Sequence, residues 1–212
     1  MPRQGQQTKR RIVDTAYALF YKGGFARASV DAIADAAGVT KRTFYYHFAS
    51  KQALVAAVLA IQHELAIAQI QHWAERVSGD PLAMVDKVFT EFAAWATRSG
   101  WRGSGFTRAA MEFAYAPGHP ARLAAREHKR AVEAWFSQEF AQNGIKAPQA
   151  LARQVMLLME GCHSLVLIHG DPSYVNAAIG AARHLVEHNL PPRPRGRPPK
   201  SPQAVHRGVR TR

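Results

Sequence analysis

The sequence is poor in cysteine and has no leading apolar segment. Its one cysteine, Cys162, has no partner for an intramolecular disulfide and lies in an apolar helical run, so we expect a buried thiol. The start, MPRQGQQTKRR, lacks the apolar core of a signal peptide, and we expect no stretch to reach the ~18 apolar residues of a membrane span. These absences predict a cytoplasmic protein that does not use a membrane.

Signatures of enzymes and metal sites are also missing. The sequence has no nucleophile elbow, no phosphate-cradling glycine loop and no cysteine metal set. Residues 184–188, HLVEH, match the inverted zinc-protease pattern, with His184 and His188 on one helix face. They end the last expected helix, where histidine complements the helix dipole, and no third ligand or cleft is evident. We therefore predict no enzymatic activity, no metal and no cofactor.

What the chain does contain is positive charge at its two ends. Residues 1–51 hold nine Lys/Arg and three Asp/Glu, and residues 190–212 hold seven Lys/Arg and no acid. Residues 52–189 hold twelve of each, so the whole net charge of +13 lies outside a neutral centre. This pattern predicts that the ends bind a polyanion and that the centre has another task. A membrane surface fits less well, because neither end is a basic amphipathic helix with an apolar anchor face.

No segment shows the sustained alternation of a strand, so the sequence predicts an all-α protein of about nine helices without internal repeats. We divide it into a small three-helix head (1–51), a larger helical body (52–189) and a tail (190–212). Caps, glycines and prolines place the helices at about 8–23, 30–37, 41–48, 51–77, 81–98, 106–115, 120–143, 148–169 and 172–188.

Residues 29–51, SVDAIADAAGVTKRTFYYHFASK, carry the clearest motif. Ser29 and Thr40 suit helix N-caps, and Gly38 supplies the left-handed residue of a sharp turn between two short helices. Phe44 and Phe48 would point inward. The residues expected to face solvent are rich in donors: Lys41, Arg42, Thr43, Tyr45, Tyr46 and His47. A helical hairpin buried in a core has no reason to expose such a row, so the segment (about 29–48) is typical of a DNA-reading helix-turn-helix.

Several cations are placed where a helix dipole disfavours them. Lys9, Arg10 and Arg11 fall at the expected start of the first helix, and Lys51 falls in the first turn after the Ser50 cap. We interpret these positions as signs of a nearby anion, for which DNA phosphate is the natural candidate.

The segment resembles the TetR family of repressors. The family's turn is matched by Ile33-Ala34 and Ala37-Gly38-Val39, and its second helix by Thr43, Phe44, Tyr45, Phe48 and Lys51. The position before Thr43 is usually small in the family and here is Arg42, so the family's base preferences do not carry over. Beyond about residue 51 the resemblance covers only the helical architecture.

We assign the predicted DNA contacts by their position on the motif. Residues near base edges are Thr40, Lys41, Arg42 and Thr43. Residues assigned to phosphate, which set the register without reading sequence, are Ser29, Tyr45, Tyr46, His47 and Lys51.

The resemblance implies a ligand pocket among the central helices, which are rich in aromatic residues and methionine. Any single such residue is more often plain core, but small molecules bind in mostly apolar pockets with a few polar groups. The predicted lining is Phe89, Trp95, Phe106, Met111, Glu112, Trp135, Met159 and His163, with His128 and Glu160 as further polar candidates. The expected ligand is a small apolar or amphipathic effector of unknown identity.

The resemblance also implies a homodimer in which the last two helices pair into a four-helix bundle. Each carries a stripe of apolar or small residues: Leu157, Leu158, Gly161 and Leu165, then Val175, Ile179, Ala182, Leu185 and Val186. A single recognition helix contacts few base pairs, so two of them, about 34–36 Å apart, are needed for specificity.

The tail has a proline-rich composition without acids that cannot build a core. Its segment 193–200 resembles an AT-hook, in which arginines flanking a glycine enter a narrow A/T-rich minor groove. The predicted groove residues are Arg193, Arg195, Gly196, Arg197, Pro198 and Lys200. The alternative is a solvated basic tail that attracts DNA without sequence preference.

These features together predict a transcriptional regulator that binds double-stranded DNA. We expect a dimeric repressor that binds a palindromic operator and is released from it by a small molecule. One alternative is an architectural protein of the nucleoid type, without an inducer. Another is a ligand-binding enzyme with a vestigial head.

Overall fold

The computed structural model describes residues 2–77 and 79–191, which form an all-α protein, as predicted. This part of the chain contains helices α1 to α9 and one short 3₁₀ turn, η1, and no strand. The elements are α1 (Pro2–Gly23), α2 (Val30–Ala36), α3 (Lys41–His47), α4 (Lys51–Ala74), η1 (Glu75–Val77), α5 (Pro81–Ala96), α6 (Gly105–Glu112), α7 (Pro120–Gln142), α8 (Pro148–His169) and α9 (Ser173–Asn189). The AT-hook-like motif lies outside the described residues.

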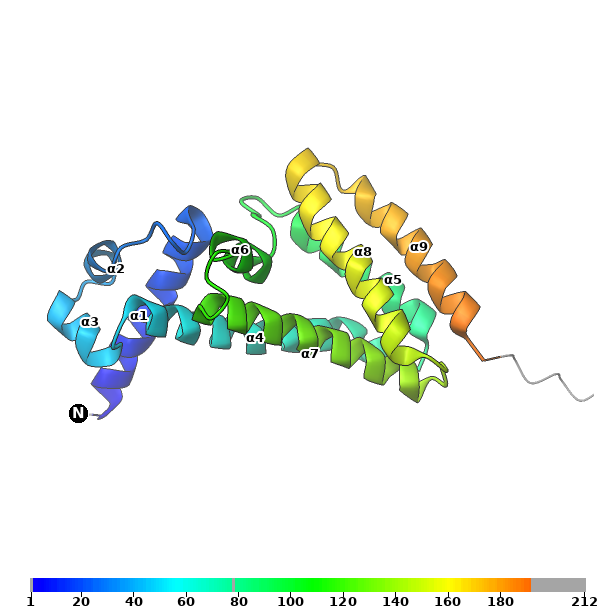
Figure 1. Cartoon of the computed structure of the whole chain (residues 1–212), viewed down its shortest axis with the longest axis horizontal. Coiled ribbons are helices and arrows are strands. Elements are labelled where there is room, and N and C mark those ends of the chain that lie inside the picture. The colour runs from blue at the N-terminus through cyan, green and yellow to red at the C-terminus, as the bar shows by residue number, and fades with distance from the viewer. Residues whose placement is uncertain (1, 78, 192–212) are drawn as a thin grey trace, which may run out of the picture.

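The helices are arranged as a head and a body joined by two long helices. Helices α1 to α3 lie at one end of the molecule and α8 and α9 at the other, with α4 and α7 running between them (Figure 1). In the body, α7 packs on α8, α8 on α9, and α5 on α9. Local signals start the body helices: Asp80 caps α5 by accepting hydrogen bonds from the amides of Leu82 and Ala83, both at 3.0 Å.

The apolar core of the head does not stop at residue 51. The phenyl rings of Phe20 and Phe44 are fully buried there with Leu54 and Val58 from the first half of α4. Phe106 from α6 belongs to the same cluster. The head is therefore packed onto α4 and α6, so a displacement of either helix would also displace the head.

The first helix begins earlier than predicted. It starts at Pro2 rather than near Thr8, so Lys9, Arg10 and Arg11 lie well inside it and the helix dipole no longer opposes them. Two of them have protein partners: Arg10 pairs with Asp14 at 3.0 Å, and Arg11 Nε donates to the carbonyl of Ala37 at 2.8 Å. The expected helix start was wrong, because the polar residues 2–7 are also helical, so the position of these cations is no longer a sign of phosphate. Their contact with phosphate stays a prediction.

Two helical stretches have the length and composition of membrane spans. They are Lys51–Val77, which contains an 18-residue window with a mean hydropathy of 1.7, and Pro148–His169, whose window has 1.3. The expectation that no stretch of the chain is long and apolar enough to span a membrane was wrong. The polar residues in these two stretches are too few to lower the mean hydropathy below that of a membrane span. Both pack within the helical body, α4 on α7 and α8 on α7 and α9, and much of the second half of α4 lines a cavity.

Candidate nucleic-acid interface and ligand cavity

The helix-turn-helix forms as its local sequence predicts. Ser29 Oγ accepts from the amide of Ala32 at 3.1 Å, and Thr40 Oγ1 accepts from that of Thr43 at 3.1 Å, so both short helices have side-chain N-caps. Gly38 has φ +63°, the left-handed conformation that favours glycine at this turn. Phe44 is fully buried and Phe48 nearly so, which anchors α3 in the head.

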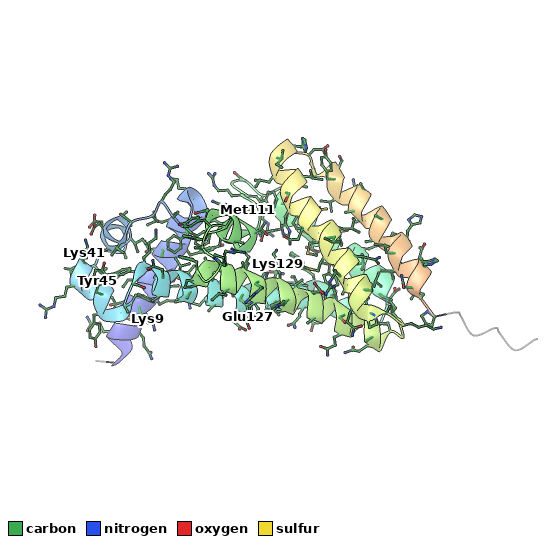
Figure 2. All side chains as sticks on the ribbon, viewed as in Figure 1. Lys9, Lys41, Tyr45, Met111, Glu127 and Lys129 are labelled. Carbon is green, nitrogen blue, oxygen red and sulfur yellow. The ribbon has the colours of Figure 1, made fainter. Side chains whose placement is uncertain are left out.

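The opposite face of α3 is exposed. Tyr46 is 83% exposed and Tyr45 48%, while Lys41 and Arg42 are also exposed and Thr43 and His47 are half-buried. Lys41 and Tyr45 lie at the end of the molecule farthest from the body (Figure 2). A row of donors on a helix face that no other part of the described chain covers fits the major groove of DNA.

Two of the predicted contact residues already have partners in the free protein. Lys41 Nζ pairs with Asp31 Oδ1 at 2.8 Å, and this hydrogen bond raises the pKa of Lys41. Both side chains are largely exposed, so DNA phosphate or a base can replace Asp31 at little expense. Lys51 Nζ donates to the carbonyl of Ala26 at 2.7 Å. Its charge in the first turn of α4 is thus already satisfied in part, and its contact with phosphate stays a prediction.

Replacing Tyr45 by phenylalanine is expected to weaken binding to all DNA sequences by a similar factor. The substitution removes a hydroxyl assigned to phosphate and leaves the ring on Phe44, 5.3 Å between centroids. Loss of one such hydrogen bond corresponds to about threefold to tenfold in affinity. Fluorescence anisotropy on a set of single-base operator variants measures it, with Tyr115→Phe, an exposed tyrosine outside the motif, as the control. A loss confined to one base position would contradict the assignment.

The body contains a cavity of about 330 Å³ that reaches the head. The second half of α4 lines it with Leu65, Gln69 and Trp73, and α5 contributes Phe92 and Trp95. Its opposite end is formed by the head itself, through Tyr17 and Tyr21 of α1 and by Phe25. The volume falls at the lower end of the range for small-molecule sites, and most of the lining is apolar or aromatic.

Only half of the predicted pocket residues line this cavity. Trp95, Phe106, Met159 and His163 do, together with the polar candidates His128 and Glu160. The prediction was wrong for the other four, which do not line the cavity. Phe89 is fully buried in the body core, and Met111 is 67% exposed. Trp135 packs on Phe136, and Glu112 accepts a hydrogen bond from the amide of Ala26 at 2.8 Å. They share helices with lining residues but lie on other faces.

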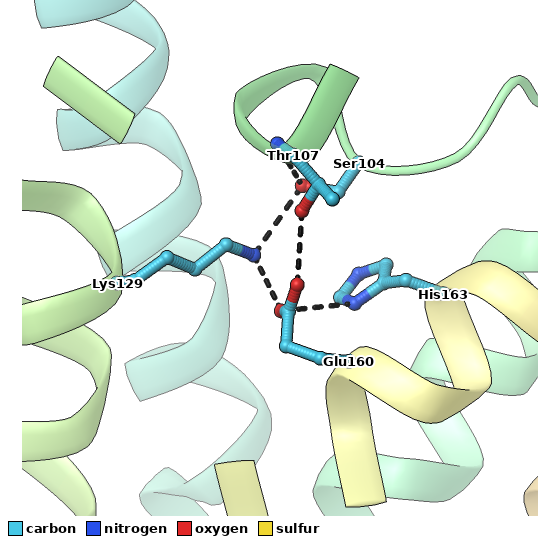
Figure 3. A network of polar contacts seen from close by, with 5 residues as sticks. All are labelled: Ser104, Thr107, Lys129, Glu160 and His163. Atoms are coloured by element: carbon cyan, nitrogen blue, oxygen red, sulfur yellow. Dashed lines mark hydrogen bonds and ion pairs between the residues drawn. The ribbon is translucent and has the colours of Figure 1, made fainter. Parts of the chain in front are cut away.

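A charged network forms one wall of the cavity. Glu160 Oε1 lies 2.5 Å from Lys129 Nζ and 3.3 Å from His163 Nδ1, and its Oε2 accepts from Thr107 Oγ1 at 2.9 Å (Figure 3). Burial by itself would raise the pKa of Glu160, but His163 and Lys129 lower it to about 2. The carboxylate is therefore ionised and fully engaged.

A pair of histidines joins α4 to α7 beside this network. Their Nδ1 atoms, in His63 and His128, are 3.2 Å apart, and the ring of His128 stacks on Phe106 at 3.8 Å between centroids. His128 is 6% exposed, and burial together with the charge of Lys129 lowers its pKa to about 3. His128 is thus neutral at any physiological pH.

The unfolding free energy is expected to fall as pH decreases below about 6.5. The unfolded chain protonates His128 with an ordinary pKa, whereas the native protein does not until about pH 3, so His128 contributes full stability above 6.5 and loses it progressively below. The slope approaches ~1.4 kcal/mol per pH unit for this one group. Urea unfolding between about pH 7 and pH 5 measures it.

The matched variants for this measurement are His128→Gln and His72→Gln. The first should flatten the pH dependence, and the second, whose side chain is 75% exposed, should leave it unchanged. Equal slopes in the wild type and His128→Gln would show that His128 does not hold a neutral state.

The head is fastened to the body by hydrogen bonds from α6 and the loop before it. Arg108 Nη1 donates to the carbonyl of Tyr21 at 2.9 Å, and the amide of Arg102 donates to the Tyr21 hydroxyl at 3.1 Å. Glu112 holds the amide of Ala26. The loop from α1 to α2 is thus held on both sides, by Lys51 at the start of α4 and by α6.

Known proteins resemble this chain in the sequence of its head and in its fold. Residues 12–58, from the second half of α1 to the first part of α4, match the model of bacterial regulatory proteins of the tetR family. Over 87% of the chain the fold matches SCO4454, a TetR-family transcriptional regulator from Streptomyces coelicolor, covering 96% of that chain with a TM-score of 0.78 and 24% identity. Residues 12–58 thus match the TetR family, and the described fold is that of TetR-family regulators. The reduced form of NemR from Escherichia coli shares this TetR-family fold, with a TM-score of 0.72 over 87% of this chain and 97% of that one, at 18% identity.

Sequence similarity to curated HTH-type regulators covers only about a third of the chain. The chain is 43% identical over 61 residues to TtgR of Pseudomonas putida, 29% of each protein. It is 35% identical over 71 residues to UidR of Escherichia coli, 34% of this chain and 36% of that one. It therefore spans about a third of the length of the curated relatives that it matches. The body's ligand is not inherited from them.

Sequence reasoning missed the residues that connect the cavity of this protein to its head. Tyr17, Tyr21, Arg108 and Lys129 all line the cavity and were not predicted. Arg108 and Tyr21 are 87 residues apart, and neither belongs to a motif that the sequence displays. A polar residue on the inner face of a short helix, like Arg108 on α6, was the only available signal.

Proposed function

We propose that this protein is a ligand-responsive transcriptional regulator, a repressor that binds a palindromic operator as a homodimer in the cytoplasm and has no enzymatic role. One observation carries the proposal: a helix-turn-helix with both helices capped presents the Lys41–His47 face of α3 to solvent at one end of the molecule. The cavity that extends from the body to α1 supports the response to a ligand.

Dimerisation is supported by an uncovered apolar face. Leu157, Leu165 and Ile168 on α8 are 69%, 37% and 71% exposed, with Gly161 on the same side of the helix. On α9 the predicted stripe is only partly available, because Val175, Ala182 and Val186 are buried within the chain. The face offered to a second copy is therefore mainly that of α8, with the half-buried Ile179 and Leu185 beside it.

Linkage sets the direction of the response. A ligand releases the repressor only if it binds the DNA-free conformation more tightly than the DNA-bound one. The second half of α4 lines the cavity while the first half packs in the head, so a ligand that displaces α4 changes the separation of the two recognition helices.

Genome-wide footprinting of the protein tests the proposal. We expect a small number of sites with two half-sites centred about one turn of DNA, or a multiple of it, apart. Broad coverage of A/T-rich DNA would favour an architectural role instead. Loss of footprints from a variant with Arg42 and Thr43 replaced by alanine, on the exposed face of α3, ties the sites to the motif.

A further inference from the structure

The charges that line the cavity do not balance one another. Three cations, Arg98, Arg108 and Lys129, line it together with one carboxylate, Glu160. Lys129 and Glu160 pair with each other. Neither arginine forms an ion pair with any residue in the described part of the chain. The cavity therefore carries an excess of positive charge.

Arg108 is the better placed of the two arginines. Arg98 is exposed, whereas Arg108 is half-buried on α6 and its guanidinium lies 5.9 Å from the ring of Tyr21. Arg108 donates to the neutral carbonyl of Tyr21 through Nη1, which leaves several of its other N–H groups available. Tyr17 adds a further donor, because burial raises the pKa of its hydroxyl and keeps it protonated.

A cationic ligand does not fit these surroundings. Glu160 already accepts from Lys129 and Thr107 and lies against His163. A cation would have to displace the Lys129 ammonium and leave it unpaired inside the cavity, which is costly. The polar groups that remain available to a ligand, the N–H groups of Arg108 and the hydroxyl of Tyr17, are hydrogen-bond donors. They therefore favour an anion.

The rest of the cavity suits a ring. Phe92 and Trp95, with ring centroids 6.0 Å apart, line it together with Trp73 and Ile70. Aromatic walls of this kind favour flat apolar bodies.

We propose that the cavity takes an aromatic organic anion, such as a carboxylate, whose charged group binds Arg108 and draws it away from the carbonyl of Tyr21. The inference rests on the proposed function and names its ligand class. A carboxylate offers the guanidinium two charged acceptors in place of one neutral oxygen, so it is the stronger partner. Breaking the contact between α6 and α1 would then transmit binding directly to the head, alongside any movement of α4.

The first test uses the full chain and three matched probes: 2-naphthoate, its neutral amide 2-naphthamide, and the cation 2-naphthylmethylammonium. Binding is measured by calorimetry and by quenching of tryptophan fluorescence, since Trp73 and Trp95 line the cavity. We expect the carboxylate to bind about tenfold or more tightly than the amide, and the cation to bind most weakly. A carboxylate that binds no better than the amide, or binding by none of the three, would overturn the proposal.

The second test locates the preference. Arg108→Gln keeps a donor near Tyr21 but removes the charge, so it should abolish the preference for carboxylate over amide. Arg122→Gln is the matched control, because Arg122 Nη1 also donates to a backbone carbonyl, that of Ala114 at 2.8 Å, but does not line the cavity. A preference that survives Arg108→Gln, or disappears in Arg122→Gln, would refute the role of Arg108.

The third test separates the ligand class from the proposed function. With an operator found by footprinting, the carboxylate should weaken DNA binding of the wild type and have no effect on Arg108→Gln. If the protein binds the carboxylate through Arg108 but binds no operator, the proposed regulatory function is wrong and the proposed ligand class still holds. If the protein binds the operator and the bound carboxylate does not weaken that binding, the coupling through Arg108 is refuted.

Discussion

Replacing Phe44 by alanine is expected to abolish operator binding by unfolding the head. Phe44 is the fully buried residue of α3, packed edge-on against Tyr45 and 6.0 Å from the ring of Phe48. Truncating a buried phenylalanine to alanine costs about 3–5 kcal/mol. Helix α3 is a seven-residue helix and has little stability of its own, so this loss removes the surface that reads DNA. Urea unfolding and operator binding by anisotropy measure the two effects.

Phe140→Ala is the matched control for Phe44→Ala. Phe140 is also fully buried, but it lies on α7 in the body, in the other apolar cluster. It should lower the unfolding free energy by a similar amount, yet the protein that remains folded should bind the operator normally. If Phe44→Ala bound DNA with wild-type affinity, the packing of α3 on the head would not be what positions its outer face.

Replacing Leu157 by glutamate is expected to produce monomers that bind the operator about a thousandfold more weakly or worse. Leu157 is 69% exposed on the proposed dimer face of α8, and a charge at the centre of an apolar interface is strongly unfavourable. A monomer reads one half-site, so its affinity falls toward that of non-specific binding, which is at least about a thousandfold weaker than specific binding. Analytical ultracentrifugation gives the oligomeric state, and anisotropy on whole and half operators gives the affinity.

The control for this substitution is Leu123→Glu. Leu123 is 43% exposed near the start of α7 and is not part of the proposed dimer face, so the same change in charge should leave the oligomeric state and the affinity unaltered. If Leu157→Glu remained dimeric, the contact between copies would use a different surface.

The parts of this protein that were predictable from the sequence are those made by contacts between near neighbours in the chain. The caps Ser29, Thr40 and Ser50 each bond an amide three residues on. The turn needs only the left-handed conformation of Gly38. For this reason the helix-turn-helix, its buried phenylalanines and the all-α fold were readable before the structure, as was the buried thiol of Cys162, whose pKa is raised by burial to about 11.

The start of α1 and the lining of the cavity could not be predicted from the sequence. A polar segment such as residues 2–7 carries no apolar periodicity, although it is helical. In the body, periodicity shows which face of a helix is apolar but not which neighbour covers it, so Met111 and Trp135 looked equivalent to Phe106 and Met159.

By itself, then, the chain's order of residues determined the helices, the capped DNA-reading motif and the basic character of the head, because each follows from bonds within a few residues. Tertiary packing alone decided that Arg108 meets Tyr21 and that His63 meets His128, over separations of 87 and 65 residues. Those meetings depend on how whole helices cross, which is set by the summed fit of many side chains rather than by any local pattern.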